Sequence, residues 1–163
     1  MTDVSTETTI GERRAIPVGV IVAGLVLCVI GLGVATYLTI QHVNSSLSLS
    51  CPNTGRINCE KVTTSQYSHA AGIPVAVLGV VYFVVALALM TPQAWRSPAP
   101  WVRLARFGWL GVGLLMVLYL VWAEFFGVSA ICLWCTSVHV ITFLLFVLVA
   151  FTEAWVAPTA EVP

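Results

Sequence analysis

The stretch Cys132-Leu133-Trp134-Cys135 opens the last long apolar run of the chain, and this run continues to Trp155. Two cysteines at positions i and i+3 of a helix lie on one face, within reach of a disulfide. At a helix N-terminus, the positive end of the helix dipole lowers the pKa of a thiol and favours the reactive thiolate. The sequence therefore predicts a membrane helix that begins with a redox-capable thiol pair.

The composition indicates an integral membrane protein. Of the 163 residues, 59% are hydrophobic and only 9% are charged, and the mean hydropathy is +0.97. Soluble domains carry about 25% charged residues. The formal net charge is zero, so nothing in the charge points to nucleic acid.

Four apolar runs predict an all-α membrane bundle of four transmembrane helices. A helix needs about 20 apolar residues to cross a bilayer core of about 30 Å. The first run is too long for the apolar core of a signal peptide, so we expect an uncleaved helix. The helices are expected at 17–40, 73–90, 107–126 and 131–155. The resulting membrane domain, 17–156, lies between a disordered cytoplasmic tail at 1–16 and a short tail at 157–163.

The polar segment 41–72 between the first two helices contains Cys51 and Cys59. The residues between the two cysteines include proline, asparagine and glycine, which favour turns and let the chain double back. A short surface helix is expected after Cys59, within 60–71. A loop of about thirty residues is more typical of a functional segment than of a simple connection.

The basic residues predict the orientation of the bundle. Five of the seven lie before the first predicted helix and between the second and third: Arg13, Arg14, Arg96, Arg103 and Arg106. By the positive-inside rule this side is cytoplasmic, as are both termini. The loop and the Cys132–Cys135 pair then meet at the outer face of the cell membrane, where disulfides persist.

Two cysteine pairs at one membrane face suggest a relay of thiol–disulfide exchange, in which a thiolate attacks one sulfur of a disulfide. Cys51 and Cys59, on a loop, suit exchange with a protein partner. Cys132 and Cys135, on a membrane helix, suit transfer to a lipid-soluble acceptor, for which a quinone is the natural candidate. Cys28 lies in the middle of the first apolar run and is expected to be a buried structural cysteine.

In combination these features resemble the vitamin K epoxide reductase family and its bacterial homologues. The resemblance covers about 17–155 and rests on four helices, a Cys-x7-Cys loop and a Cys-x-x-Cys at the fourth helix. Further matches are Ser65, Gly72-Ile73-Pro74, Gly79 and Tyr82. The resemblance implies a four-helix bundle around a quinone, such as menaquinone or ubiquinone, and an oxidoreductase that drives disulfide formation in exported proteins.

Individual roles also follow from the resemblance. The family's loop cysteines, here Cys51 and Cys59, exchange with a thioredoxin-like protein, and its second helix cysteine, here Cys135, lies next to the quinone. Ser65 matches a serine expected to help hold the loop or the quinone. Many bacterial members carry a fused thioredoxin-like domain, for which this chain is too short, so we expect a separate exported partner. Where the animal enzymes have a tyrosine this chain has His139, and epoxide reduction is not implied.

Several alternatives stay open at this point. His139 either contacts the quinone or forms a hydrogen bond to a neighbouring helix, and Glu124 either relays protons or simply meets water. Four cysteines at one face also suit a zinc site, although the Cys-x7-Cys spacing is loose for one and no metal is expected. A DsbB-type oxidase and a structural tetraspan protein are the remaining alternatives. The preferred interpretation is an enzyme in which electrons pass from Cys51 and Cys59 through Cys132 and Cys135 to quinone.

Overall fold

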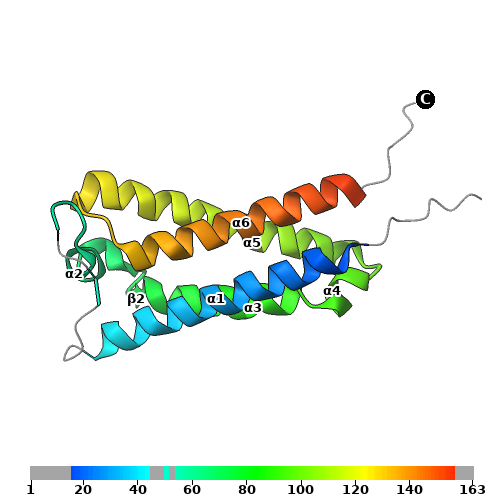
Figure 1. Ribbon diagram of the computed structural model, residues 1–163, viewed down its shortest axis with the longest axis horizontal. Helices are drawn as coiled ribbons and strands as arrows, with labels where there is room; N and C mark the ends of the chain where they lie inside the picture. The colour runs from blue at the N-terminus through cyan, green and yellow to red at the C-terminus, as the bar shows by residue number, and fades with distance from the viewer. Residues whose placement is uncertain (1–15, 45–49, 52–53, 157–163) are drawn as a thin grey trace, which may run out of the picture.

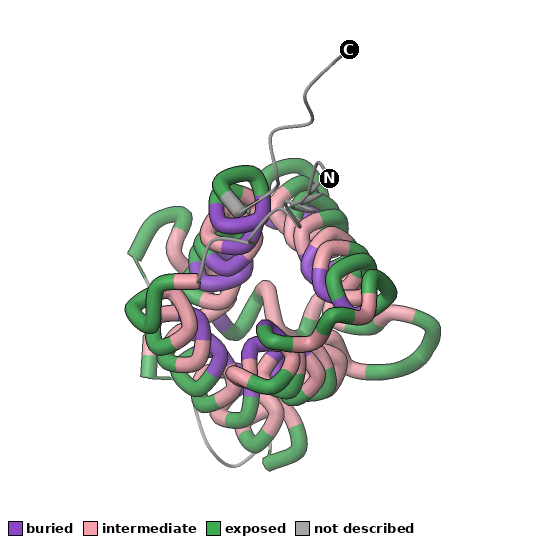
Figure 2. The backbone as a smooth tube through the Cα atoms, turned by 90° about the vertical axis from the view of Figure 1, so that its right-hand side faces the viewer, coloured by how far each residue is buried: buried purple, intermediate pink, exposed green. Residues whose placement is uncertain are grey.

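Four apolar helices form the body of the computed structural model, which describes residues 16–44, 50–51 and 54–156. They are α1 (Val18–Val43), α3 (Val75–Leu89), α5 (Pro100–Trp122) and α6 (Leu133–Val156). The helix α1 packs against α3 and α6, and α5 packs against α3 and α6 (Figures 1 and 2). This arrangement confirms the predicted all-α membrane bundle. Both predicted tails, 1–16 and 157–163, fall outside the described residues, apart from residue 16.

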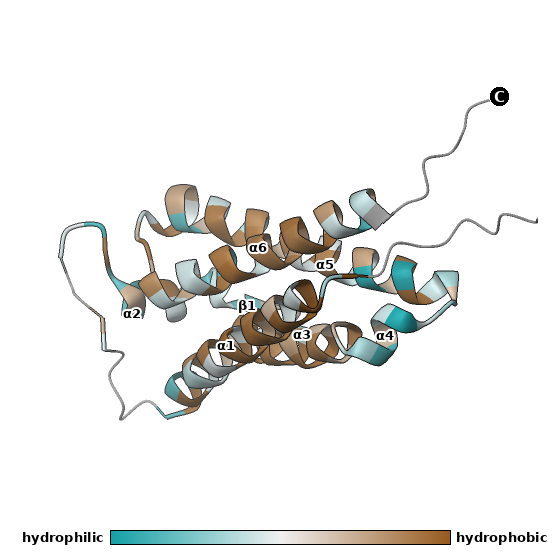
Figure 3. Ribbon diagram, turned by 45° about the vertical axis from the view of Figure 1, so that its right-hand side comes forward, coloured by the Kyte–Doolittle hydropathy of each residue, from teal (hydrophilic) through white to brown (hydrophobic). Residues whose placement is uncertain are grey.

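Within the described residues, three helical segments are long and apolar enough to cross a membrane, namely α1, the continuous helical stretch Pro100–Val128, and Leu133–Trp155. The helix α3 is apolar but has only 15 residues, which corresponds to about 22 Å of rise against a hydrocarbon core of about 30 Å. Figure 3 shows hydrophobic residues along the length of the bundle, while hydrophilic residues gather at its two ends.

Short elements connect the helices. The predicted surface helix is α2 (Cys59–Thr63), followed by the 3-10 turn η1 (Gln66–Ser68) and a two-stranded hairpin, β1 (His69–Ala70) and β2 (Ile73–Pro74). At the other end lies α4 (Pro92–Arg96), and a π-helical turn, η2 (Ala123–Val128), extends α5. The loop between α1 and α3 therefore lies at the same end of the bundle as the start of α6 (Figure 1).

The third long helix begins at Pro100, seven residues before the expected start at 107. The sequence interpretation treated the Pro- and Arg-containing segment 91–106 as a loop. Proline is tolerated in the first helical turn, where its missing N–H would have no partner in any case. Helix formation from Pro100 also places Arg106 inside the bundle, where it is only 2% exposed.

Arg106 ties the ends of α3, α4, α5 and α6 together. Its guanidinium donates to Glu153 Oε1 at 2.9 Å and to the backbone carbonyls of Leu89 and Ala94. The guanidinium carbon lies 3.5 Å from the ring centroid of Trp95. Two of the arginines counted as loop charges therefore serve a structural cluster, because Arg103 also contacts Glu153, at 2.8 Å.

The centre of the bundle is apolar and closely packed. Cys28, Phe83 and Leu145 are fully buried there, so Cys28 is a core residue. A Cβ atom at Gly31 would overlap the ring of Phe83, which explains the glycine on the facing surface of α1. Figure 2 shows the buried parts of the helices turned toward the interior.

Candidate redox site

The loop cysteines are joined to each other. Cys51 and Cys59 form a disulfide with a Cα–Cα distance of 6.1 Å. Cys59 is the first residue of α2, and the side chain of Asn58 caps this helix by accepting from Lys61 N at 2.9 Å. Cys59 is 1% exposed, whereas Cys51 is half-buried. Cys51 is therefore the sulfur of this pair that is more open to the surroundings.

Backbone pairing holds the loop against the start of α6. Ile131 N donates to Arg56 O at 2.8 Å, and Asn58 N donates to Ile131 O at 3.1 Å. These bonds form a parallel bridge between Ile57 and Ile131. Cys59 directly follows Asn58, and Cys132 directly follows Ile131. The bridge therefore brings the loop pair, Cys51 and Cys59, alongside the inner pair, Cys132 and Cys135. No spacing rule in the sequence predicted this contact.

Trp134, inside the Cys-x-x-Cys motif, provides a second attachment for the loop. Its indole Nε1 donates to the carbonyl of Ser50 at 3.1 Å, and its ring lies 4.9 Å from that of Tyr37, centroid to centroid. Because Ser50 directly precedes Cys51, both ends of the disulfide-bonded segment are fixed to the first turn of α6.

The inner cysteines differ in their surroundings. Both are thiols. Cys132 precedes the first residue of α6 and is fully buried, and its sulfur accepts a hydrogen bond from Cys135 N at 3.2 Å. The hydrogen bond from the Cys135 thiol, together with this backbone bond, lowers the pKa of Cys132 despite its burial. The helix start thus stabilises a thiolate at Cys132, the first cysteine of the motif.

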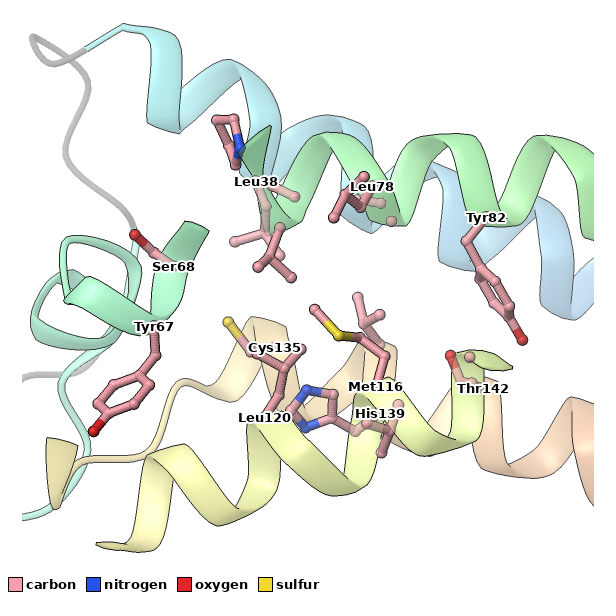
Figure 4. Close-up of a pocket in the computed structure, with 18 of the residues that line it drawn as sticks. Leu38, Tyr67, Ser68, Leu78, Tyr82, Met116, Leu120, Cys135, His139 and Thr142 are labelled. Carbon is pink, nitrogen blue, oxygen red and sulfur yellow. The ribbon is translucent and has the colours of Figure 1, made fainter. Parts of the chain in front are cut away.

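A cavity of about 360 Å³ lies beside Cys135, and Cys132 does not line it. Ligand pockets commonly occupy about 300–1,000 Å³ with apolar walls and a few polar groups. In Figure 4, Cys135 and His139 lie between Tyr67 and Ser68 at one end of the cavity and Tyr82 and Thr142 at the other. The apolar part of the wall includes Leu38, Leu78, Val112, Met116, Val117 and Leu120.

The structure places both predicted non-cysteine site residues at this cavity. His139 is 7% exposed, lies one turn beyond Cys135 on α6, and lines the wall. Ser65 also lines the cavity. Its hydroxyl donates to Val62 O at 2.8 Å, and its carbonyl accepts from the Ser68 hydroxyl at 2.7 Å. Ser65 therefore shapes the loop and leaves its hydroxyl oxygen able to accept a further hydrogen bond.

Further polar residues that line the cavity include Tyr67, Tyr82 and Glu124. Tyr67 and Tyr82 contribute their rings, and the Tyr82 hydroxyl is buried. Glu124, for which the sequence left proton relay and simple contact with water as alternatives, is only 5% exposed and also lines the cavity. Its burial disfavours simple contact with water. An ionisable residue in an apolar run was the available signal, since such residues are rare and commonly functional.

A helical membrane bundle with a thiol pair beside an apolar cavity, and a second cysteine pair fastened next to it, defines a membrane thiol–disulfide oxidoreductase. The sequence profile of the vitamin K epoxide reductase family matches residues 22–150. The chain belongs to this family and is an oxidoreductase acting on disulfides. No curated protein matches the chain.

Proposed function

We propose that the protein reoxidises a separate thioredoxin-like protein and passes the electrons to a membrane quinone, so that disulfides form in exported proteins. The observation that carries this proposal is the division of the inner pair. Cys135 faces an apolar cavity, while Cys132 lies away from it, beside the loop pair. Family membership supports the reaction class.

The chemistry of the cavity wall fits a quinone ring. The wall is mainly aliphatic and aromatic, and its polar groups are few: Ser65, Tyr67, Ser68, Tyr82, Glu124, His139 and Thr142 are among them. His139 and Ser65 would hold the ring oxygens by hydrogen bonds, and the apolar wall would hold the ring and the start of the isoprenoid tail. A bound quinone, such as menaquinone or ubiquinone, supplies an acceptor for two electrons and two protons.

The loop pair is suited to receive electrons from the partner. A partner thiolate attacks Cys51, the more open sulfur, and forms a mixed disulfide while Cys59 leaves as a thiolate. A second partner thiolate then attacks the partner's own sulfur in the mixed disulfide and releases Cys51. The loop is now a dithiol, and the partner carries the new disulfide. The burial of Cys59 and the half-burial of Cys51 support this order.

Electrons next pass from the loop to the inner pair. When the inner pair is a disulfide, the Cys59 thiolate attacks Cys132 and releases Cys135. Cys51 then attacks Cys59, which closes the Cys51–Cys59 disulfide and releases Cys132. The arrangement in the structure, a loop disulfide beside the two thiols Cys132 and Cys135, corresponds to the end of this step. The lowered pKa of Cys132 makes it the better leaving group.

The proposed topology is a multi-pass cell-membrane protein with both termini in the cytoplasm. The two cysteine pairs lie at one end of the bundle, and α4 with Arg103 and Arg106 lies at the other (Figure 1). An outer location of the cysteine end agrees with an oxidising compartment. This topology requires the short helix α3 to cross the membrane together with its flanking residues.

Other activities are less well supported. A DsbB-type oxidase would do the same work, but the match to the vitamin K epoxide reductase family favours the present ancestry. Among the described residues, no group of three or more His, Cys, Asp or Glu side chains is arranged to hold a metal. A purely structural tetraspan protein gives no reason for a thiol pair at an apolar cavity.

The direct test uses the purified protein in mild detergent. We expect it to oxidise a small dithiol with a soluble quinone analogue, followed by the change in quinone absorbance, and to carry an extractable quinone. C135S abolishes the reaction, whereas C28A, which removes a core cysteine remote from the loop, retains it. Failure of the wild-type protein to reduce any quinone analogue would refute the proposed acceptor.

A further inference from the structure

Glu124 is a buried carboxyl group for which the described residues provide no ion pair. It lies in η2 and is 5% exposed, and its Oε1 atom has no hydrogen-bond partner among the described residues. Burial of a carboxyl group is unfavourable unless the group is fully paired. The buried Glu153 illustrates the structural case, because two arginines bind it. Glu124 has no such ion pair in the part of the chain that the structure describes.

Glu124 lies where two cavities meet. It lines the large cavity together with Cys135 and His139. It also lines a second cavity of about 100 Å³, whose other walls are Arg56, Phe125, Ser129, Ala130 and Ile131. Glu124 is the residue common to the walls of both. Two walls of the second cavity, Arg56 and Ile131, belong to the segments joined by the backbone bridge between Ile57 and Ile131.

The carboxyl group is also directly connected to the inner thiol pair. The backbone of Cys132 lies close enough to interact with this carboxyl group, and the charge of Glu124 acts on the thiols of both Cys132 and Cys135. The turn after η2 maintains this placement, because Ala130 N donates to the Glu124 carbonyl at 3.1 Å. Ser129 adopts a left-handed conformation, with φ of 53°, to make the return.

We propose that Glu124 is the proton-exchange residue of the inner cysteine pair. This inference rests on the proposed function and deepens it. Oxidation of two thiols by a quinone gives one disulfide and one quinol, with transfer of two electrons and two protons. The Glu124 carboxylate takes the proton of Cys132, so that the Cys132 sulfur can form the bond to Cys135. The protonated carboxyl then returns this proton to the large cavity, where the acceptor takes it up together with the proton that Cys135, which lines the same cavity, gives up directly.

The surroundings of Glu124 decide which group can exchange this proton. The titratable groups that line the two cavities with Glu124, or interact with it, are Arg56, Tyr67, Cys132, Cys135, His139, His42 and Tyr82. Arginine keeps its proton under all relevant conditions. His139 lies a full turn beyond Cys135, so it suits the acceptor end of the cavity. Glu124 is the carboxyl group that contacts Cys132.

The test compares E124Q and E124D with E60Q, a matched control at an exposed glutamate next to Cys59. All variants carry C28A and C135S, the loop cysteines stay in their disulfide, and the alkylation rate of Cys132 is followed against pH. E124Q removes a negative charge that raises the pKa of Cys132, so its alkylation midpoint moves to lower pH. E60Q and E124D keep the midpoint near that of the parent.

A second readout uses the same substitutions with Cys135 restored. Reduction of a soluble quinone analogue by a small dithiol falls about a hundredfold in E124Q, as expected for loss of a proton-transfer group. E124D recovers part of this rate. An unchanged alkylation midpoint together with an unchanged rate in E124Q would overturn the proposal. An alkylation shift in a protein that reduces no quinone would refute the proposed acceptor while supporting the Glu124–Cys132 coupling.

The wild-type protein provides a readout that does not depend on the folding of any variant. Infrared difference spectra are recorded while the inner pair is cycled between dithiol and disulfide with small-molecule reagents. A change in the C=O stretching band of a protonated carboxyl group is expected. Absence of any carboxyl signal during this cycle would contradict proton exchange at Glu124.

Discussion

The hydrogen bond from Trp134 Nε1 to the Ser50 carbonyl holds the loop next to Cys51, and W134F removes it while keeping an aromatic ring against Tyr37. A hydrogen bond contributes about 1 kcal/mol net. A loss of about 1 kcal/mol corresponds to about a fivefold decrease in the equilibrium constant for docking of the loop, because 1.4 kcal/mol is a factor of ten. The backbone bridge at Ile131 remains, so the loop is weakened and not released.

The expected result is a selective loss of one activity. Turnover driven by a thioredoxin-like protein requires the loop pair, so it falls in W134F by a factor of up to about five. Turnover driven by a small dithiol, which reaches the inner pair directly, stays within twofold of the wild type. Both rates are measured by the absorbance change of a soluble quinone analogue. W101F, at an exposed tryptophan at the start of α5, is the control and leaves both rates unchanged.

Two results would refute this reasoning. Equal loss of both activities would mean that Trp134 acts on the cavity or on α6 and not through the loop. Unchanged activity with the protein partner would mean that the bond to Ser50 does not limit docking. Hydrogen exchange of the backbone amides in W134F and W101F distinguishes a loosened loop from an altered bundle. A loosened loop raises the exchange rate only near Cys59, whereas an altered bundle also raises it in the helices.

Four further expectations follow from the same geometry. C59S blocks oxidation of the protein partner and leaves oxidation of a small dithiol partly intact; if both rates drop to the same extent, the loop is not a separate step. Reduced Cys51 and Cys59 react with a membrane-impermeant maleimide in intact cells, whereas labelling only after cell lysis would reverse the proposed orientation. C132S shows a long-wavelength charge-transfer absorption between the Cys135 thiolate and bound quinone, and C135S shows none; the opposite assignment of colour would invert the two roles. R106M leaves Glu153 with Arg103 alone and lowers the free energy of unfolding by about 2–3 kcal/mol, as for the loss of a hydrogen bond to a charged group. A thermal-shift assay in detergent compares it with R96M, at an exposed arginine, and equal unfolding temperatures of the two variants would contradict this expectation.

The helices were predictable because each depends on a local property of the sequence. An uninterrupted apolar run of sufficient length specifies α1 and α6 without reference to the rest of the chain. The start of α5 was harder, since proline and arginine residues favour a loop locally. Their helical conformation depends on Glu153, almost fifty residues further along the chain, which binds the guanidinium of Arg106. A window along the sequence does not contain that contact.

The sequence by itself determined the four apolar helices, the two cysteine pairs and the resemblance to a family, because run length, spacing and motif are properties of neighbouring residues. It also indicated His139 and Ser65, which the structure places at one cavity. The resemblance likewise implied that Cys135 lies next to the acceptor, and Cys135 lines this cavity. Only the tertiary structure decided that the loop is bonded to Ile131 and Trp134 and that Glu124 is buried. These features arise from contacts between residues distant along the chain, whose partners are set by how α1, α3, α5 and α6 pack together.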